Sequence, residues 1–246
     1  SSTGTVSIVA GTDSGGFSPD GTLATAAKLG DPADVALDAA GTVYFTDFSN
    51  FRVRHFQIGG TLTTIAGTNN GLGGPAQDAN IRGNSAALAS DSSGNLYVAG
   101  YEVSSLGVIS EYLGTGGPGF TGDGGLAVDA LVSDATGVAV DASGNIFISD
   151  GWNNRIRKID TSGIINTIAG NGAFTNTGDG GLASAATLAF PGPIAVDGTG
   201  NVFVGARQGP GRGANVFRKI GTNGVIGVVA GSYTASGYAG DNGPAT

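Results

Sequence analysis

The stretch GNIFISDGWNNRIRKIDTSGIINTIAGNG, residues 144–172, decides the fold of this chain. Near its start Ile146 and Ile148 alternate with Phe147 and Ser149. A period of two residues indicates a β-strand, and Val, Ile, Phe and Tyr are the residues that strands prefer. Glycines and Asx residues separate the alternating segments and favour turns. The stretch therefore predicts three short antiparallel strands joined by turns.

Near-copies of this stretch recur along the chain, and a strand ending in Ala-Gly or its equivalent aligns them. This anchor reads SIVAG (7–11), TTIAG (63–67), SEYLG (110–114), NTIAG (166–170) and GVVAG (227–231). Four short strands, here called a to d, in each repeat of roughly 50 residues are typical of propeller blades. We therefore predict an all-β fold, a β-propeller segment of four-stranded antiparallel blades over residues 1–246. The complete blades fall at about 33–67, 86–114, 136–170 and 193–231.

A second anchor is an Asp-x-x-Gly turn between strands a and b. Asp can accept backbone N–H bonds at the start of a tight turn, and Gly can adopt the left-handed conformation at its end. We interpret these acids as turn caps rather than catalytic groups. The acids are Asp38, Asp91, Asp141 and Asp197, and the glycines are Gly41, Gly94, Gly144 and Gly200.

A longer connector precedes strand a of a blade and contains Asp followed by an Ala- and Leu-rich stretch. This pattern predicts a capped single helical turn, with the leucine packing onto the blade. A calcium loop is the alternative, but calcium takes six or more oxygens and each connector offers one Asp among glycines. The predicted N-caps are Asp20, Asp123, Asp179 and Asp241, and the leucines are Leu23, Leu126 and Leu182.

The composition argues against several partners. The formal net charge is −8 with only 11 Lys+Arg, so the chain would repel nucleic acid and anionic membrane surfaces. No apolar run approaches 18 residues, so we expect no membrane insertion. Cysteine is absent, which excludes disulfides, thiolate metal sites and cysteine nucleophiles. The Ser-, Thr-, Gly- and Asn-rich composition favours an extracellular or periplasmic protein, and the initial Ser suggests a mature or trimmed chain.

The segments SDGWNNRIRKID, INTIAGNG, TGDGG and PGPIAVDGTGNVFV resemble the NHL-repeat β-propeller family. The resemblance covers nearly the whole chain. It implies blades around a central channel, most often six in that family, but no single activity. Relatives include RNA-binding modules, sensor domains of bacterial receptor kinases, adhesion-protein domains and a zinc-dependent lyase.

The residues needed by the catalytic and RNA-binding relatives are missing. The lyase uses histidine ligands, whereas His55 is the only histidine here, at the strand position of Lys158. A zinc catalyst needs about three protein ligands. RNA-binding relatives use a basic face that this acidic chain lacks, and no Ser/His/Asp set can be assembled. We expect no catalytic residues, metal or cofactor.

Two blades carry an acid at the end of strand b and an arginine at the start of strand c. The pairs are Asp47 with Arg52 and Asp150 with Arg155, and we interpret them as structural ion pairs. In the other two blades both residues are absent together. There we place Gly100 and Gly205 at the acid position, and Val216 at the arginine position of the last blade.

The loops between strands b and c carry the candidate binding residues. They are Phe48, Tyr101, Trp152 and Arg207, with Arg212 in a glycine-rich insertion of the last blade. Large aromatic residues at loop tips can anchor sugars or peptides. Packing between neighbouring blades is the alternative. Trp152, the only tryptophan, is the strongest single candidate.

Both ends of the chain correspond to the same part of the repeat. The start contains a lone strand d with its connector, and the end contains a connector that finishes in GDNGPAT. Either the chain is part of a longer protein, or subunits associate through open β-edges. We therefore expect a non-catalytic extracellular scaffold or module that binds a protein or glycan ligand. A structural subunit of a filament or surface array is one alternative, and a lyase-like propeller enzyme is the second.

Overall fold

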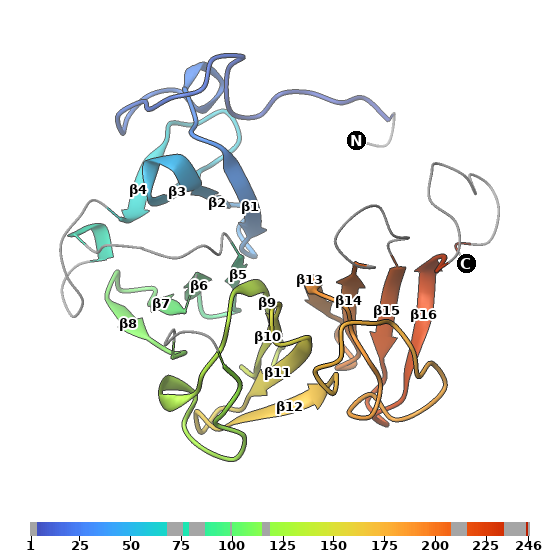
Figure 1. Cartoon of the computed structure of the whole chain (residues 1–246). Coiled ribbons are helices and arrows are strands. Elements are labelled where there is room, and N and C mark those ends of the chain that lie inside the picture. Colours follow the sequence, from blue (N-terminus) through green and yellow to red (C-terminus); the bar gives the residue numbers. More distant parts are fainter. Residues whose placement is uncertain are drawn as a thin grey trace. The chain divides into compact units, whose positions relative to one another are not determined.

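The computed structural model describes residues 4–67, 76–78, 87–98, 100–114, 119–207, 216–233 and 245. Four antiparallel sheets are present, each built from four strands that are consecutive in sequence (Figure 1). Blade 1 contains β1 (Pro32–Leu37), β2 (Val43–Asp47), β3 (Arg52–Phe56) and β4 (Thr63–Ala66). Blade 2 contains β5 (Leu88–Ser90), β6 (Leu96–Val98), β7 (Tyr101–Val103) and β8 (Ile109–Glu111). Blade 3 contains β9 (Ala135–Val140), β10 (Ile146–Asp150), β11 (Arg155–Ile159) and β12 (Ile165–Ala169). Blade 4 contains β13 (Pro191–Val196), β14 (Val202–Ala206), β15 (Val216–Ile220) and β16 (Ile226–Gly231).

The predicted fold class is confirmed: the chain is all-β and consists of four-stranded antiparallel β-propeller blades. The helical elements are single 3-10 turns, namely η1 (Ala24–Ala26), η2 (Phe48–Asn50), η3 (Ala76–Asp78) and η4 (Ala127–Asp129). Within the ranges given above, no helix has the length and apolar character needed to cross a membrane.

The chain divides into two compact units, Ser1–Ser110 and Glu111–Thr246, each with its own apolar core. In the first unit, Val53 and Ala66 of blade 1 pack with Leu88, Val98 and other residues of blade 2. In the second unit, a larger cluster joins blade 3 to blade 4. Alternation along the strands thus places the branched residues where neighbouring sheets of one unit meet.

The Asp-x-x-Gly turns form as predicted. In blade 3, Oδ1 of Asp141 accepts hydrogen bonds from the backbone N–H groups of Ser143 and Asn145, both at 2.9 Å. Gly144 closes the turn with a left-handed φ of 86°. The same acceptor pattern is seen at the turn acids of the other blades, Asp38, Asp91 and Asp197.

The connectors differ from the prediction. Leu23 forms an isolated backbone bridge with Thr61, which leaves its side chain exposed and turns Ala24 inward to full burial. Leu126 and Leu182 are exposed in the same way. No side-chain hydrogen bond caps η1 or η4, so Asp20 and Asp123 are not N-caps. The predicted buried residue is wrong by one position: Ala24 is buried instead of Leu23, because the bridge to Thr61 fixes which face of the connector meets the sheet.

Strand register corrects one equivalence between blades. Asp47 lies opposite Arg52, and Asp150 lies opposite Arg155. In blade 4 the residue opposite Val216 is Ala206. Ala206, rather than Gly205, therefore occupies the acid position.

The two ends of the repeat pattern are only partly described. Residues 6–11, predicted as a lone strand d, lie outside the sixteen strands. In the trailing connector, Asp241 lies outside the described residues. The carbonyl of Ala245 accepts a hydrogen bond from the N–H of Gly231 at 2.8 Å.

Candidate functional site

Three of the four blades contain a completely buried arginine in the middle of the third strand. These residues are Arg54 in β3, Arg157 in β11 and Arg218 in β15, and none has any exposed surface. Each lies opposite an apolar residue of the second strand. A buried guanidinium must have charged partners to be tolerated, so the partners define the local structure.

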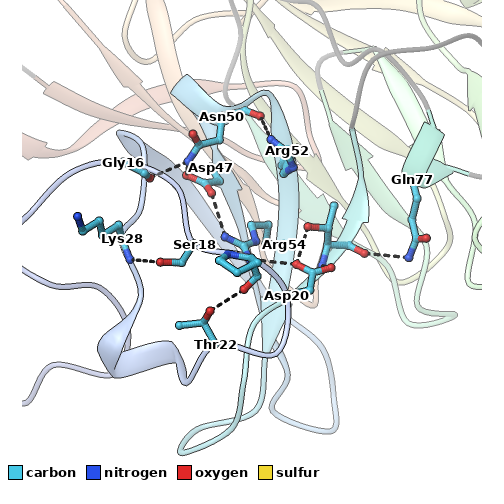
Figure 2. Close-up of polar contacts among 12 residues, drawn as sticks. Gly16, Ser18, Asp20, Thr22, Lys28, Asp47, Asn50, Arg52, Arg54 and Gln77 are labelled. Carbon is cyan, nitrogen blue, oxygen red and sulfur yellow. Dashed lines mark hydrogen bonds and ion pairs between the residues drawn. The ribbon is translucent and has the colours of Figure 1, made fainter.

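In blade 1, the partners of Arg54 are two carboxylates from different parts of the chain. Nη2 of Arg54 lies 3.0 Å from Asp20 of the connector, and Nη1 lies 3.4 Å from Asp47 at the end of β2 (Figure 2). Blade 3 repeats this arrangement, with Arg157 at 2.9 Å from Asp123 and 3.4 Å from Asp150. The arginine therefore joins the connector to the sheet.

The predicted pairs Asp47–Arg52 and Asp150–Arg155 are wrong, because no ion pair joins these residues in the described structure. Oδ1 of Asp47 already accepts from the backbone N–H of Gly30 at 2.6 Å and from Nδ2 of Asn50 at 2.8 Å. Its Oδ2 faces Arg54 instead. Arg52 donates to the carbonyl of Asn50 at 2.7 Å.

Arg155, like Arg52, donates hydrogen bonds to backbone carbonyls rather than to a carboxylate. Its guanidinium donates to the backbone carbonyls of Asn153 at 2.8 Å and Asn171 at 3.0 Å. These bonds fix the loop after β10 to the connector that follows β12. In blades 1 and 3 the outer arginine thus binds backbone, and the inner arginine binds carboxylates.

Two acids of these clusters, Asp20 and Asp150, have shifted pKa values. Burial raises the pKa of Asp20, but hydrogen bonds from Thr64 and Arg54 outweigh burial and hold it below the usual range. Thr64 donates from its backbone N–H at 2.9 Å and its hydroxyl at 2.8 Å. For the more deeply buried Asp150 the balance is reversed, and burial raises its pKa despite bonds from Asn153 and Ser133.

An aromatic ring covers each arginine pair. The ring of Phe17 lies 4.6 Å from the guanidinium of Arg52 and 5.5 Å from that of Arg54. The ring of Phe120 lies 3.8 Å from Arg155 and 4.6 Å from Arg157. Phe17 and Phe120 both stand three residues before the connector acid. We call the set of connector ring, connector acid, strand acid and two arginines the arginine unit.

Blade 4 keeps two of the five members of the arginine unit, Asp179 and Arg218. Ala206 replaces the strand acid, Val216 the outer arginine and Asn176 the connector ring. Arg218 still binds Asp179 at 2.8 Å, and it donates to the carbonyl of Thr187 at 2.6 Å.

Asp179, the connector acid of blade 4, has a second partner besides Arg218. Tyr233 donates to Asp179 at 2.7 Å, and burial together with this bond raises the pKa of Tyr233 to about 12. Backbone and tyrosine groups thus replace the missing carboxylate and ring.

Blade 2 has none of the charged residues of the arginine unit. Tyr101 lies opposite Val98, as Arg54 lies opposite Phe45, so a tyrosine occupies the inner arginine position. It is the first residue of β7 and packs against the blade core. The structure therefore places this candidate binding residue in a strand rather than at a loop tip.

Trp152 is both exposed and held in place. Its side chain is 65% exposed, and its ring meets that of Phe190 edge to face at 5.0 Å. Its indole also bonds the side chain of Asp134. Burial raises the pKa of Asp134, although the bond from Trp152 acts in the opposite direction. An exposed ring with two fixed contacts is typical of an anchor for a ligand.

A short segment links Trp152 to Arg207. The N–H of Phe190 donates to Oδ1 of Asn154 at 2.9 Å. The carbonyl of the preceding Ala189 accepts from the N–H of Arg207 at 2.9 Å. Two of the predicted candidates, Trp152 and Arg207, therefore border one segment of the second unit. We call Trp152, Phe190, Asp134 and Arg207 the aromatic site.

The other candidates do not join this site. Phe48 lies in η2 of the first unit and is partly exposed. Arg212 lies outside the described residues. His55 stacks on Tyr44 with ring centroids 5.6 Å apart, and burial lowers its pKa. Over the described ranges, no group of three or more His, Asp or Glu side chains could hold a metal ion.

Sequence reasoning missed Phe190 and Asp134. Both residues stand just before strand a and have left-handed φ angles, 44° and 62°, as Asp31 does at 49°. Such angles are unusual for residues other than glycine. The available signal was the position itself, where Phe190 replaces the aspartate of two other blades.

Comparison with known proteins agrees with this architecture. Residues 116–177 match the family model of the teneurin NHL domain. Over 55 residues the chain is 46% identical to zebrafish (Danio rerio) teneurin-3 and 44% identical to the mouse (Mus musculus) protein. These matches cover 22% of this chain and only 2% of either teneurin.

Solved structures of the same fold extend the likeness beyond this region. A Bacteroides thetaiotaomicron protein of unknown function is 26% identical, with a TM-score of 0.55 over 71% of this chain and 44% of that one. A gluconolactonase from Xanthomonas campestris has the same TM-score at 13% identity, covering 86% of this chain and 65% of that one. An auxiliary nutrient binding protein from Bacteroides ovatus has a TM-score of 0.53 at 14% identity, over 72% and 46% of the two chains. The last two show the fold alone.

The blades and the matched repeat together identify the class of protein. The four-stranded blades show a β-propeller fold, and residues 116–177 match an NHL-repeat model, that of the teneurin NHL domain. The matched region, 116–177, contains blade 3 with its complete arginine unit and Trp152.

Proposed function

We propose that this chain is a non-catalytic binding module that acts outside the cell and uses the aromatic site to hold a protein or glycan ligand. The proposal rests on one observation: Trp152 is exposed, yet its ring is in contact with neighbouring side chains. Trp152 is 65% exposed, and its ring contacts Phe190 and Asp134. A side chain ordered before binding loses little conformational entropy when a ligand stacks on it.

The arginine units support a non-catalytic role. A general acid or base needs access to a substrate proton. Arg157 and Asp150 have no exposed surface, and their bonds run to each other and to neighbouring protein groups. The units therefore serve to join connectors to sheets, and they leave the exposed loops to carry recognition.

An extracellular location is part of the proposal and rests on composition. The chain is rich in Gly and small polar residues, carries 12% charged residues and contains no cysteine that oxidation could affect. An acidic chain with few exposed cations also suits a module that must not bind nucleic acid or anionic lipid.

The test is a binding screen with a matched pair of variants. The labelled chain is applied to a glycan array and to a displayed peptide library, and every hit is repeated with Trp152→Ala and Leu182→Ala. Leu182 is 63% exposed, belongs to the same unit and lies beside the β15–β16 turn, at the opposite end of a blade from the loops. We expect Trp152→Ala to weaken binding at least tenfold, which is about 1.4 kcal/mol, and Leu182→Ala to leave it unchanged. Equal affinities for both variants would refute the aromatic site.

A further inference from the structure

Asp134 is a partly buried acid of the aromatic site that has no cationic partner in the described chain. Arg207 reaches the site through its backbone N–H, and its guanidinium forms no ion pair with Asp134. Burial raises the pKa of Asp134, and the bond from the indole of Trp152 opposes this shift. A cation supplied by a ligand would therefore stabilise a carboxylate whose charge the protein leaves uncompensated. The ion pairs among the described residues use other acids, namely Asp20, Asp47, Asp123, Asp150 and Asp179.

Backbone hydrogen bonds place Trp152 beside this acid. The N–H of Gly151 donates to the carbonyl of Asp134 at 3.0 Å, and the N–H of Trp152 donates to the carbonyl of Ser133 at 3.3 Å. The loop after β10 is thus joined to the segment before β9. The position of the ring next to the acid follows from the main chain as well as from the indole bond.

The ring of Trp152 also lacks a cation, unlike several phenylalanine rings of the chain. No lysine or arginine lies over Trp152 in the described part of the chain, although tryptophan attracts cations more strongly than phenylalanine does. Its side chain is 65% exposed, and the ring of Phe190 stands at 87° to it, with centroids 5.0 Å apart. Two nearly perpendicular rings beside an acid form an open corner that suits a cation. The rings that already have a cation over them are those of Phe17, Phe120, Phe147 and Phe203.

We propose that the aromatic site binds the ammonium or guanidinium group of a basic peptide segment, which stacks on Trp152 and pairs with Asp134. This inference rests on the proposed function and names the ligand chemistry of the same site. The formal net charge of −8 favours the approach of such a segment. A sugar could also stack on Trp152, but an asparagine at position 134 would accept a hydroxyl bond as an aspartate does. Dependence on the charge of Asp134 therefore separates the two kinds of ligand.

Blade 1 contains the matching acid without the ring. Asp31 stands directly before β1, as Asp134 stands directly before β9, and both have a left-handed φ. Ser49 occupies the position of Trp152, two residues after the strand acid, and its hydroxyl donates to the carboxylate of Asp31. Asp31→Asn and Asp134→Asn thus remove the same charge from equivalent positions, and only the second position lies beside a tryptophan.

The experiment compares these two variants with the natural chain. The probe is tetralysine with blocked ends, and the same peptide acetylated on its side chains is the neutral counterpart. Isothermal titration calorimetry measures each affinity. We expect Asp134→Asn to weaken tetralysine binding at least about fivefold, and Asp31→Asn to change it by less than about twofold. The acetylated peptide should bind the natural chain at least about fivefold more weakly than tetralysine does.

Fluorescence keeps the proposal testable if Asp134→Asn does not fold. Trp152 is the only tryptophan, so its emission reports binding at the ring and not elsewhere on an acidic surface. Tetralysine should change the emission of the natural chain in a saturable manner, and the acetylated peptide should not. An emission that tetralysine leaves unchanged overturns the proposal.

The outcomes also separate this inference from the proposed function. Equal weakening of tetralysine binding in Asp134→Asn and Asp31→Asn would show that the peptide responds to net charge alone, and would overturn the cationic ligand. A neutral glycan or peptide whose binding needs Trp152 but tolerates Asp134→Asn would also overturn it, while the binding module itself would stand. Tetralysine binding that falls in Asp134→Asn and persists in Asp31→Asn supports the proposal.

Discussion

The buried guanidinium of Arg157 binds the carboxylate of Asp123 at 2.9 Å, across 34 positions of sequence. This bond ties a glycine-rich connector to the sheet that follows it. Figure 2 shows the equivalent bond in blade 1, where Arg54 reaches both the connector acid and the strand acid. Blade stability should therefore depend on the inner arginine far more than on the outer one.

Replacing the inner and outer arginines by methionine tests this difference. Arg157→Met leaves Asp150 buried without its cation, and breaking a buried pair costs about 3–5 kcal/mol. Arg155→Met removes two bonds to backbone carbonyls and a stacking contact, and should cost about 1 kcal/mol. Urea unfolding measures both changes. Equal losses in the two variants would show that the carboxylate contacts contribute no more than the outer contacts.

Blade 2 offers the reverse experiment. Tyr101→Arg places a guanidinium where Gly100 provides no carboxylate and where the sequence has Leu72 in place of a connector acid. Tyr101 is only partly buried, so its unpaired guanidinium would lose part of its hydration, and we expect a loss of about 1–3 kcal/mol in the free energy of unfolding. Tyr101→Phe is the control and should lose about 1 kcal/mol or less. A stable Tyr101→Arg variant would mean that this position tolerates a cation without the rest of the arginine unit.

Two glycine-to-alanine changes separate backbone strain from steric contact. At Gly41 a Cβ would meet nothing within 4 Å, but φ is 78°. Gly41→Ala should therefore destabilise by about 1–2 kcal/mol through strain alone. At Gly227 the space is equally open and φ lies outside the left-handed range, so Gly227→Ala should be neutral or stabilise by about 0.5 kcal/mol. Thermal melting of the two variants measures the difference, and a shift of the same sign in both would contradict this assignment.

The single histidine predicts a pH dependence of stability. Burial lowers the pKa of His55 from 6.5 in the folded chain. The unfolded chain therefore takes up this proton at higher pH than the folded chain does. The contribution of neutral His55 is fully present above about pH 6.5 and is lost as the pH falls through the folded pKa.

An NMR titration of the His55 ring measures the folded pKa directly. His55→Phe keeps an aromatic ring beside Tyr44 without the titration, so its stability should lack this loss between about pH 6.5 and the folded pKa. A folded pKa at or above 6.5 would contradict the expected direction.

Local features of the fold could be predicted from sequence, and long-range ones could not. The turn at Asp141 and Gly144 is set by bonds within four residues, so the sequence pattern was sufficient. Arg157 and Asp123 meet only because the connector lies across the sheet, which no local pattern encodes. The choice between Leu23 and Ala24 as the buried residue likewise depends on the bridge to Thr61.

The candidate site shows the same division. Trp152 could be chosen from sequence because it is a unique large aromatic residue in a predicted loop. Its contact with Phe190 depends on the packing of blade 3 against blade 4 and on a left-handed residue before strand a. Tyr101 looked equivalent by loop position, yet strand register places it in β7.

The single tryptophan also allows the unfolding of the second unit to be followed by its fluorescence alone. Trp152 is the only tryptophan of the chain and lies within Glu111–Thr246, in contact with Phe190 and Asp134. Its emission therefore follows the melting of blades 3 and 4, while circular dichroism follows both units. Coincident midpoints would indicate one cooperative transition, and separate midpoints would assign an order to the two halves. The natural chain thus carries an intrinsic fluorophore for half of its architecture, and no label has to be attached.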